Sequence, residues 1–167
     1  LLRQAYVGIG DNQKAFALWQ NQSARISKED FLEGIQLALK SNHDALANDL
    51  VNQYVTQGFV LTEPEWAIVA QVKSRMNQPE QAIAAWRMAL EQNPNSTSAM
   101  LNLAYALVPI SSNQALQQFI EYTENSLETQ PDVWKQMAYL AEEQGKYSHV
   151  VSYLDAYFDL KKSDYPI

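Results

Sequence analysis

Cysteine is absent from this 167-residue sequence, and glycine and proline are scarce, at 5 and 6 residues. Without cysteine the chain has no disulfide, no cysteine nucleophile and no thiolate metal ligand. The shortage of glycine and proline argues against an all-β fold, which needs many turns. No run of about 18 apolar residues occurs, so the sequence predicts no direct membrane insertion.

Positive charge is also in short supply. The chain has 12 Lys and Arg against 19 Asp and Glu, which gives a formal net charge of −7. Such a surface repels phosphate groups, so neither nucleic acid nor an anionic membrane surface is expected as a partner. The composition, 47% hydrophobic and 19% charged, is nevertheless that of a globular chain with a buried core.

Helical periodicity dominates what is present. Apolar residues recur three and four apart, as in Phe31, Ile35 and Leu39. Helix breakers divide the chain at intervals of roughly 12 to 20 residues. The pattern predicts ten helices, at residues 1–9, 12–21, 28–40, 43–57, 63–76, 79–92, 96–107, 112–127, 131–143 and 147–160. The short links between them favour antiparallel neighbours.

Three of these helix ends carry recognisable signals. Ser27 with Asp30 three residues later forms a candidate capping box. Thr62 is a candidate N-cap, and Pro64 suits the first turn that follows it. Gly145 is expected to end the helix before it.

A period of about 34 residues, the length of a known type of helical repeat, runs through the chain. Trp66 and Trp134 each lie near the start of a predicted helix, and they are separated by two such periods. In several second helices a small residue is followed four positions later by a large apolar one. These pairs are Ala15 and Trp19, Ala82 and Trp86, and Ala115 and Phe119. The sequence therefore favours repeated helix–turn–helix units, and a non-repetitive helical bundle with accidental spacings is the alternative.

Residues 63–96 resemble one unit of the tetratricopeptide repeat (TPR) family, whose pattern is a Trp, a Leu-Gly pair, a Tyr, then an Ala, a Phe and a final Pro. The residues that match, some by substitution, are Trp66, Val69-Ala70, Ala82, Trp86 and Pro94. Lys73 stands where the family has Tyr. Residues 131–164 match less fully, through Trp134 and Met137-Ala138. The other units are more irregular.

The resemblance implies an all-α fold, a right-handed α-solenoid of about five TPR-like units. The expected domain is a single one over residues 1–167. Its units are residues 1–27, 28–62, 63–96, 97–130 and 131–164. Because the first unit starts within a helix, we interpret the chain as a fragment of a longer protein. In this arrangement Ala70 and Ala82 let two helices cross closely, while Trp66 and Trp86 fill the space between units.

No pattern for catalysis is found. His43 and His149 are the two histidines, and neither lies in a spacing typical of metal ligands. Gly8-Ile9-Gly10 lacks the context of a phosphate-binding loop. We therefore expect no catalytic residue, no metal and no cofactor, and the protein is predicted not to be an enzyme.

The resemblance further implies that the first helices of the units line a concave groove that binds a protein or peptide. Gln71, Tyr105 and Tyr139 follow one another at the period of the repeat. The predicted partner-binding residues are Gln71, Arg75, Leu101, Asn102, Tyr105, Lys135 and Tyr139. Tyrosine offers a large, rigid contact area, which makes Tyr105 and Tyr139 candidate anchors. The alternative is that both tyrosines pack against neighbouring helices.

The predicted function is a protein- or peptide-binding scaffold that acts in a larger assembly. Abundant Gln and Asn, the missing cysteine and the truncated ends favour a bacterial cell envelope system, such as secretion, pilus assembly, cytochrome maturation or polysaccharide export. A periplasmic location is favoured over a cytoplasmic one. The alternative function is a structural spacer or self-association module, a homo-oligomer with no peptide in the groove.

Overall fold

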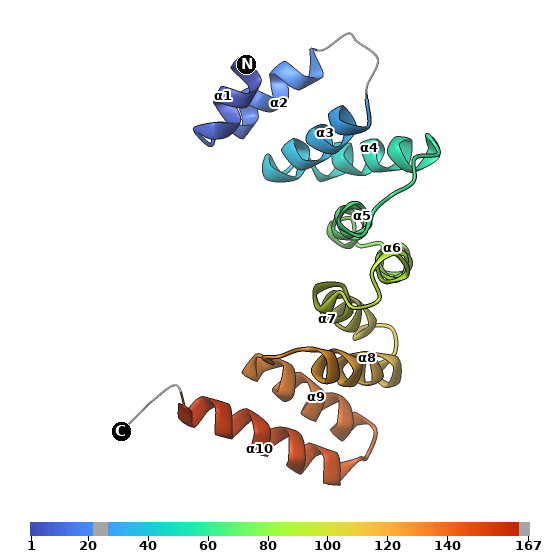
Figure 1. Cartoon of the computed structure of the whole chain (residues 1–167). Helices are drawn as coiled ribbons and strands as arrows, with labels where there is room; N and C mark the ends of the chain where they lie inside the picture. The colour runs from blue at the N-terminus through green and yellow to red at the C-terminus, as the bar shows by residue number, and fades with distance from the viewer. Residues whose placement is uncertain (22–26, 164–167) are drawn as a thin grey trace. The chain divides into compact units, whose positions relative to one another are not determined.

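The computed structural model describes residues 1–21 and 27–163 (Figure 1). These residues form ten helices and no strand. The helices are α1 (Leu2–Gly8), α2 (Asn12–Gln20), α3 (Lys28–Lys40), α4 (Asp44–Thr56), α5 (Glu63–Arg75), α6 (Pro79–Gln92), α7 (Thr97–Leu107), α8 (Ser112–Asn125), α9 (Pro131–Glu143) and α10 (Tyr147–Ser163). All ten predicted helices are confirmed, with each end within three residues of its expected position. Residue 164, the expected end of the last unit, lies outside the described residues.

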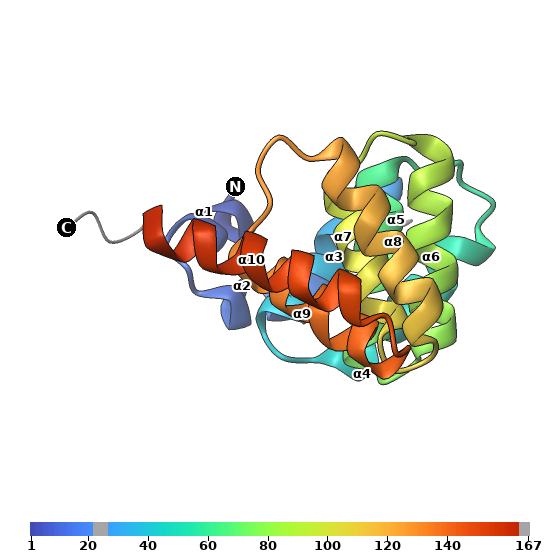
Figure 2. The same ribbon diagram turned by 90° about the horizontal axis from the view of Figure 1, so that it is seen from below.

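The chain divides into two compact units, Leu1–Ala85 and Trp86–Ile167, and the boundary falls inside α6. In the first unit α1 packs on α2, α2 on α3, α3 on α4, and α4 on α5. In the second unit α7 packs on α8, α8 on α9, and α9 on α10, and Figure 2 shows α9 and α10 side by side. Within each unit these helices thus pack against their neighbours in the sequence, as in a repeat protein. The predicted all-α, TPR-like solenoid class is confirmed.

The small and large residues that suggested the repeat lie in the core. Six of them are buried, namely Ala15, Trp19, Ala82, Trp86, Ala115 and Phe119. Ala70 is also completely buried, whereas Trp66 is half-buried. A buried alanine allows a close helix approach, and a buried aromatic ring removes a large apolar area from water.

Two of the helix starts form as their sequences predict. The Asp30 N–H donates to Ser27 Oγ and the Ser27 N–H donates to Asp30 Oδ2, each at 3.2 Å. These reciprocal bonds make a capping box at the start of α3. At the start of α5 the Thr62 N–H donates to Glu65 Oε2 at 2.7 Å, and Pro64 lies in the first turn.

Four of the five first helices end in the same turn. Gly10, Asn42, Asn77 and Gly145 follow α1, α3, α5 and α9, and their φ angles are 80°, 58°, 55° and 69°. In each case the N–H of the next residue donates to the carbonyl five positions earlier, at 2.9 to 3.0 Å. This is the hydrogen bond of the Schellman motif, in which one left-handed residue stops the helix. The turn after α7 differs, because the Ser111 N–H donates to the carbonyl of Leu107 at 2.8 Å.

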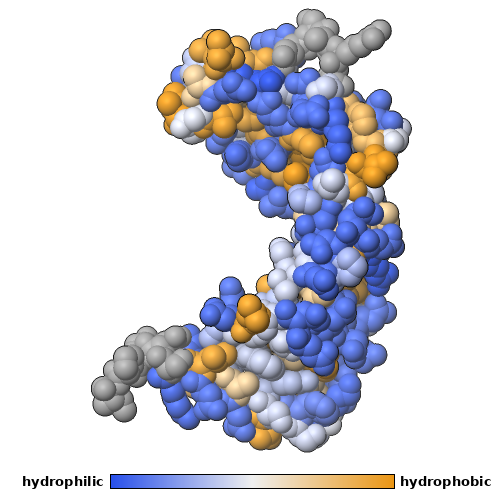
Figure 3. Space-filling view, viewed as in Figure 1, coloured by the Kyte–Doolittle hydropathy of each residue, from blue (hydrophilic) through white to orange (hydrophobic). Residues whose placement is uncertain are grey.

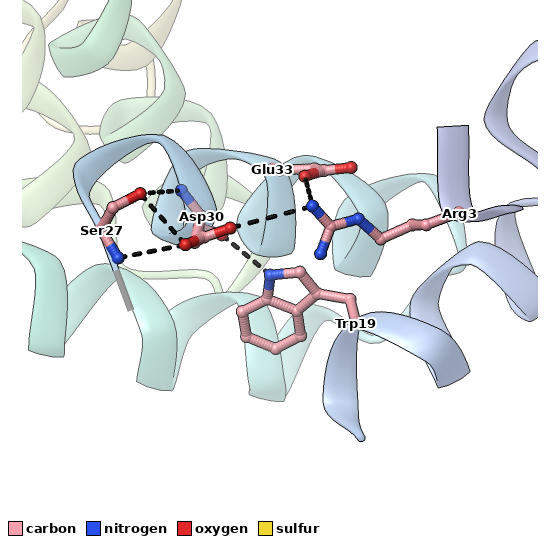
Figure 4. A network of polar contacts seen from close by, with 5 residues as sticks. All are labelled: Arg3, Trp19, Ser27, Asp30 and Glu33. Carbon is pink, nitrogen blue, oxygen red and sulfur yellow. Dashed lines mark hydrogen bonds and ion pairs between the residues drawn. The ribbon is translucent and has the colours of Figure 1, made fainter. Parts of the chain in front are cut away.

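The first two helices are attached to α3 by a set of polar contacts (Figure 4). The Trp19 indole N–H donates to the backbone carbonyl of Asp30 at 2.9 Å. Arg3 of α1 pairs with the carboxylates of Glu33 and Asp30, both on α3. The indole also lies against Gly34, whose missing side chain leaves room for the ring. The residues at this join come from three helices, so the contacts fix α1 and α2 on α3.

Across the described ranges, every helix is too short or too polar to qualify as a membrane span.

Candidate protein-binding surface

The first compact unit carries two of the predicted binding residues, both on α5. Gln71 is exposed. The Arg75 guanidinium donates to the backbone carbonyl of Leu39 at 2.9 Å and pairs with Asp44 Oδ1 at 3.1 Å. A longer bond of 3.4 Å reaches Asn42 Oδ1. Arg75 therefore connects α5 to the end of α3 and the start of α4, a structural role that its sequence position did not suggest.

The second unit carries the other five residues, and three of them lie on α7. The Tyr105 ring meets the buried ring of Phe119 edge-on, with centroids 5.0 Å apart, yet 43% of Tyr105 stays exposed. Leu101, one helical turn earlier, is half-buried. Asn102 is exposed and its amide nitrogen donates to the carbonyl of Ser98 at 2.8 Å. Tyr105 thus packs on one side and offers the rest of its ring to solvent.

The remaining two residues lie one turn apart on α9. Tyr139 is 53% exposed, the larger exposure of the two predicted anchors. The Lys135 ammonium lies over the Tyr139 ring, 5.9 Å from its centroid, within the range of a cation–π contact. This contact favours one position of the exposed ring on the helix surface.

An electrostatic contact relates α7 to α9. Burial raises the pKa of the Tyr105 hydroxyl above its ordinary value of 10.0, and the negative charge of Asp132 raises it further. Asp132 lies in the first turn of α9. The hydroxyl therefore stays protonated at neutral pH and is able to donate a hydrogen bond. Tyr105, Asp132 and Tyr139 together offer a donor, an acceptor and two aromatic rings.

A buried lysine is the main feature that the sequence reasoning missed. Lys73 is only 6% exposed, and its ammonium donates to Asn48 Oδ1 and Asn52 Oδ1, each at 2.7 Å. Burial lowers its pKa below the ordinary value of 10.5. Asn48 and Asn52 are one turn apart on α4, so the three side chains join α4 to α5. The signal in the sequence was the departure from the repeat pattern, since Lys73 stands where the resemblance places a tyrosine.

Neither histidine is one of the predicted binding residues. The His43 ring stacks on Phe16 with centroids 5.2 Å apart, and His43 directly precedes α4. His149 contacts Tyr153 within α10. No group of three or more potential metal-ligating side chains occurs among the described residues. The absence of catalytic activity stays a prediction.

Hydrophobic residues reach the surface seen in Figure 3 at several separate places, with polar residues between them. The predicted binding residues are of both kinds, because aromatic rings alternate with amide and charged groups. Such a mixture of apolar anchors and polar contacts is typical of surfaces that bind proteins or peptides.

The helix order, the pairwise packing and the repeated turns define a TPR-like helical repeat protein. Neither the family models nor the curated protein sequences give a match. The backbone, however, is similar to solved TPR structures. MamA has a TM-score of 0.87 at 14% identity, over 99% of this chain and 98% of its own.

Two further solved structures give the same result. YrrB, described as a TPR protein with an unusual peptide-binding site, has a TM-score of 0.79 at 17% identity, over 96% of this chain and 83% of its own. The C-terminal part of a TPR protein from Cytophaga hutchinsonii has a TM-score of 0.78 at 12% identity, over 96% of this chain and 64% of its own. These likenesses show the fold.

Proposed function

We propose that this chain is a scaffold that binds a protein or peptide partner through the first helices of its repeat units, without catalysis. The units are those predicted from the sequence, at residues 1–27, 28–62, 63–96, 97–130 and 131–164. The binding residues are Gln71, Arg75, Leu101, Asn102, Tyr105, Lys135 and Tyr139.

The exposure of Tyr105 and Tyr139 is the observation that carries this proposal. A tyrosine that serves only the core would be buried, as Tyr54 is, but these two expose 43% and 53% of their surface. They occupy equivalent positions in successive predicted repeats. A partner with an extended backbone would therefore contact one tyrosine in each of the two repeats. Two fixed aromatic rings give contact area at a small entropic cost.

The polar groups around the tyrosines favour a partner segment of mixed charge. The charge of Asp132 acts on the Tyr105 hydroxyl and Lys135 lies over the Tyr139 ring, so an acid influences one anchor and a base the other. The chain's net charge of −7 further favours segments that carry some basic residues. Among similar structures, the description of YrrB as having a peptide-binding site is consistent with this use of the fold.

The test is a selection of peptides from a random library on the immobilised chain, followed by affinity measurements on the selected peptides. The double variant Tyr105→Ala, Tyr139→Ala should weaken binding by about tenfold or more, because each ring is a central anchor. Tyr147→Ala is the matched control, since Tyr147 is an exposed tyrosine on α10 outside the proposed surface. Equal binding by the double variant and the parent would overturn the proposal, provided that the circular dichroism of both is the same.

We also propose that the scaffold belongs to a bacterial cell envelope system and works in the periplasm. The absence of cysteine supports this, because an oxidising compartment penalises unpaired thiols. Fractionation of the source cells, with an antibody against the chain, tests the proposal. Recovery of the protein in the cytoplasmic fraction alone would contradict it.

A further inference from the structure

We infer that a second copy of this chain docks on α10, and that the two α10 helices pair antiparallel about a twofold axis. This self-association surface consists of Tyr147, Val151, Leu154 and Phe158. It does not rest on the peptide-binding proposal, whose residues lie on α5, α7 and α9.

The four residues form one apolar strip along α10. Their spacings of four, three and four residues place them on one side of the helix, as in a coiled-coil seam. Tyr147, Val151 and Phe158 are 68%, 60% and 54% exposed, and Leu154 is half-buried. Three large apolar side chains in a row at such exposure are costly in water, unlike a single exposed one.

The strip is distinct from the side of α10 that packs on α9. That side is occupied by Tyr153, whose ring tilts against Trp134 with centroids 6.0 Å apart, and by the half-buried Val150 and Tyr157. In Figures 1 and 2 no other helix among the described residues of this unit lies against the side of α10 turned away from α9. Helix α9 therefore covers only part of the apolar surface of α10, and the strip lies outside the covered part.

The order of the side chains in the strip fits a second copy in antiparallel alignment. When two such strips are aligned about their centres, Tyr147 meets Phe158 of the other copy and Val151 meets its Leu154. Aromatic rings then face aromatic rings, and aliphatic groups face aliphatic groups. This is the self-complementarity that a twofold interface requires, in which each residue i contacts j and each j contacts i.

The charges at the ends of α10 favour the same alignment. Lys161 and Lys162 lie in its last turn, and the exposed Glu142 and Glu143 lie at the end of α9, just before α10 begins. Antiparallel pairing brings the basic end of one α10 towards the acidic end of the other copy's α9. Parallel pairing would instead place the two lysine pairs side by side, which is repulsive.

Sedimentation of the chain at concentrations up to about 100 µM tests the association. We expect a concentration-dependent dimer. Val151→Glu should raise its dissociation constant by about tenfold or more, because the carboxylate would be buried without a partner. Leu127→Glu is the matched control, since Leu127 is fully exposed outside the strip, and it should leave the dimer unchanged. A monomer at all concentrations, or a dimer that Val151→Glu does not weaken, would overturn the inference.

The absence of cysteine allows a direct test of the alignment. Tyr147→Cys and Phe158→Cys are prepared as separate single-cysteine proteins and oxidised alone and as a mixture. Antiparallel pairing predicts a disulfide-linked dimer in the mixture and little in either protein alone. Efficient linking of each protein to itself would show parallel pairing and contradict the inferred arrangement. Because both positions lie outside the proposed peptide-binding surface, either result leaves that proposal untouched.

Discussion

Gly34 of α3 and Trp19 of α2 lie so close that a Cβ atom at position 34 would overlap the indole ring. The ring is buried and its N–H is bonded to the carbonyl of Asp30, so it has little freedom to move away. Glycine is ordinarily a poor residue inside a helix. Its presence in the middle of α3 is explained by the space that Trp19 needs.

Gly34→Ala should therefore destabilise the chain by about 1–3 kcal/mol through overpacking, although alanine is the better helix former. Urea unfolding followed by far-UV circular dichroism measures the change. Gly8→Ala is the control, because Gly8 ends α1 with open space around its Cα. That variant should be neutral or slightly stabilising. A Gly34→Ala protein as stable as the parent would show that the indole gives way easily.

Arg75 of α5 allows a test of the structural role of its contacts with α3 and α4. Arg75→Lys keeps the charge but loses the guanidinium that reaches both the Leu39 carbonyl and Asp44. We expect a loss of about 1 kcal/mol in the free energy of unfolding. Arg87→Lys serves as the comparison, since Arg87 is exposed and has one longer contact of 3.4 Å, to Gln114. An equal loss of stability in both variants would show that the Arg75 contacts with Leu39 and Asp44 do not contribute to the free energy of unfolding.

Lys73 should make stability depend on alkaline pH in a defined direction. Burial lowers its pKa in the folded chain, so between that lowered value and the unfolded value of 10.5 the unfolded chain binds more protons. Its contribution to stability therefore becomes more favourable as pH rises through this window. Comparison of the melting temperatures of Lys73→Met and the parent from neutral pH to 10.5 isolates it. The melting temperature of the parent should rise relative to that of Lys73→Met as the pH increases. A difference between the two melting temperatures that does not change with pH would contradict the lowered pKa of Lys73.

Glu65 should make the stability of the fold depend on pH in the acidic range. Burial tends to raise its pKa, but hydrogen bonds from Lys28 and Thr62 outweigh this and the pKa lies below its ordinary value of 4.5. The ion pair with Lys28, at 2.9 Å, joins α5 to α3. A lowered carboxyl pKa stabilises the fold above pH 4.5, and this stabilisation is lost as pH falls through the folded-state value.

Glu65→Gln should consequently cost about 1 kcal/mol at pH 7 and progressively less in acid, since glutamine retains the cap but not the charge. Unfolding at a series of pH values measures this. Glu91→Gln, the same change at an exposed place on α6, controls for net charge. A Glu65→Gln penalty that stays constant down to the lowest pH would rule out the carboxylate as its source.

Gly145 allows the cost of a left-handed residue to be measured without a steric clash. Its φ is +69°, and a Cβ atom there would meet nothing within 4 Å. Gly145→Ala should thus lose about 1 kcal/mol from backbone strain alone. Asn77→Gly, at φ 55°, should change stability in the opposite direction by a few tenths of a kcal/mol. Thermal unfolding of both variants checks the pair, and equal signs would contradict the backbone explanation.

Local signals predicted the helices well, because a period of 3.6 residues and a capping residue are both read within a few positions. The capping box of Ser27 with Asp30, and the helix start at Thr62 and Pro64, needed no knowledge of tertiary contacts. The contacts of Trp19, Arg75 and Lys73 join residues 11 to 36 positions apart. Periodicity indicates which face of a helix is buried, but it does not identify the side chain on the next helix that fills the space.

The candidate surface shows the same division. The period of the repeat is sufficient to assign Gln71, Tyr105 and Tyr139 to equivalent positions from the sequence alone. It does not indicate that Arg75 is engaged by α3 and α4, nor that Tyr105 lies edge-on to Phe119. These details depend on side-chain directions and on how closely two helices approach, which no single helix determines.

The repeated turn after the first helices shows what is periodic in this chain. The recurring feature is a positive φ angle at the residue that ends the helix. Glycine adopts this angle at Gly10 and Gly145, and asparagine adopts it at Asn42 and Asn77. The side chains at equivalent positions are less regular. Met100 lies 34 residues from both Trp66 and Trp134, and Asp49 lies four residues after Ala45, where Trp86 follows Ala82. Stacking of the units therefore depends on helices of suitable length that end in a suitable turn. It tolerates variation in the side chains at equivalent positions.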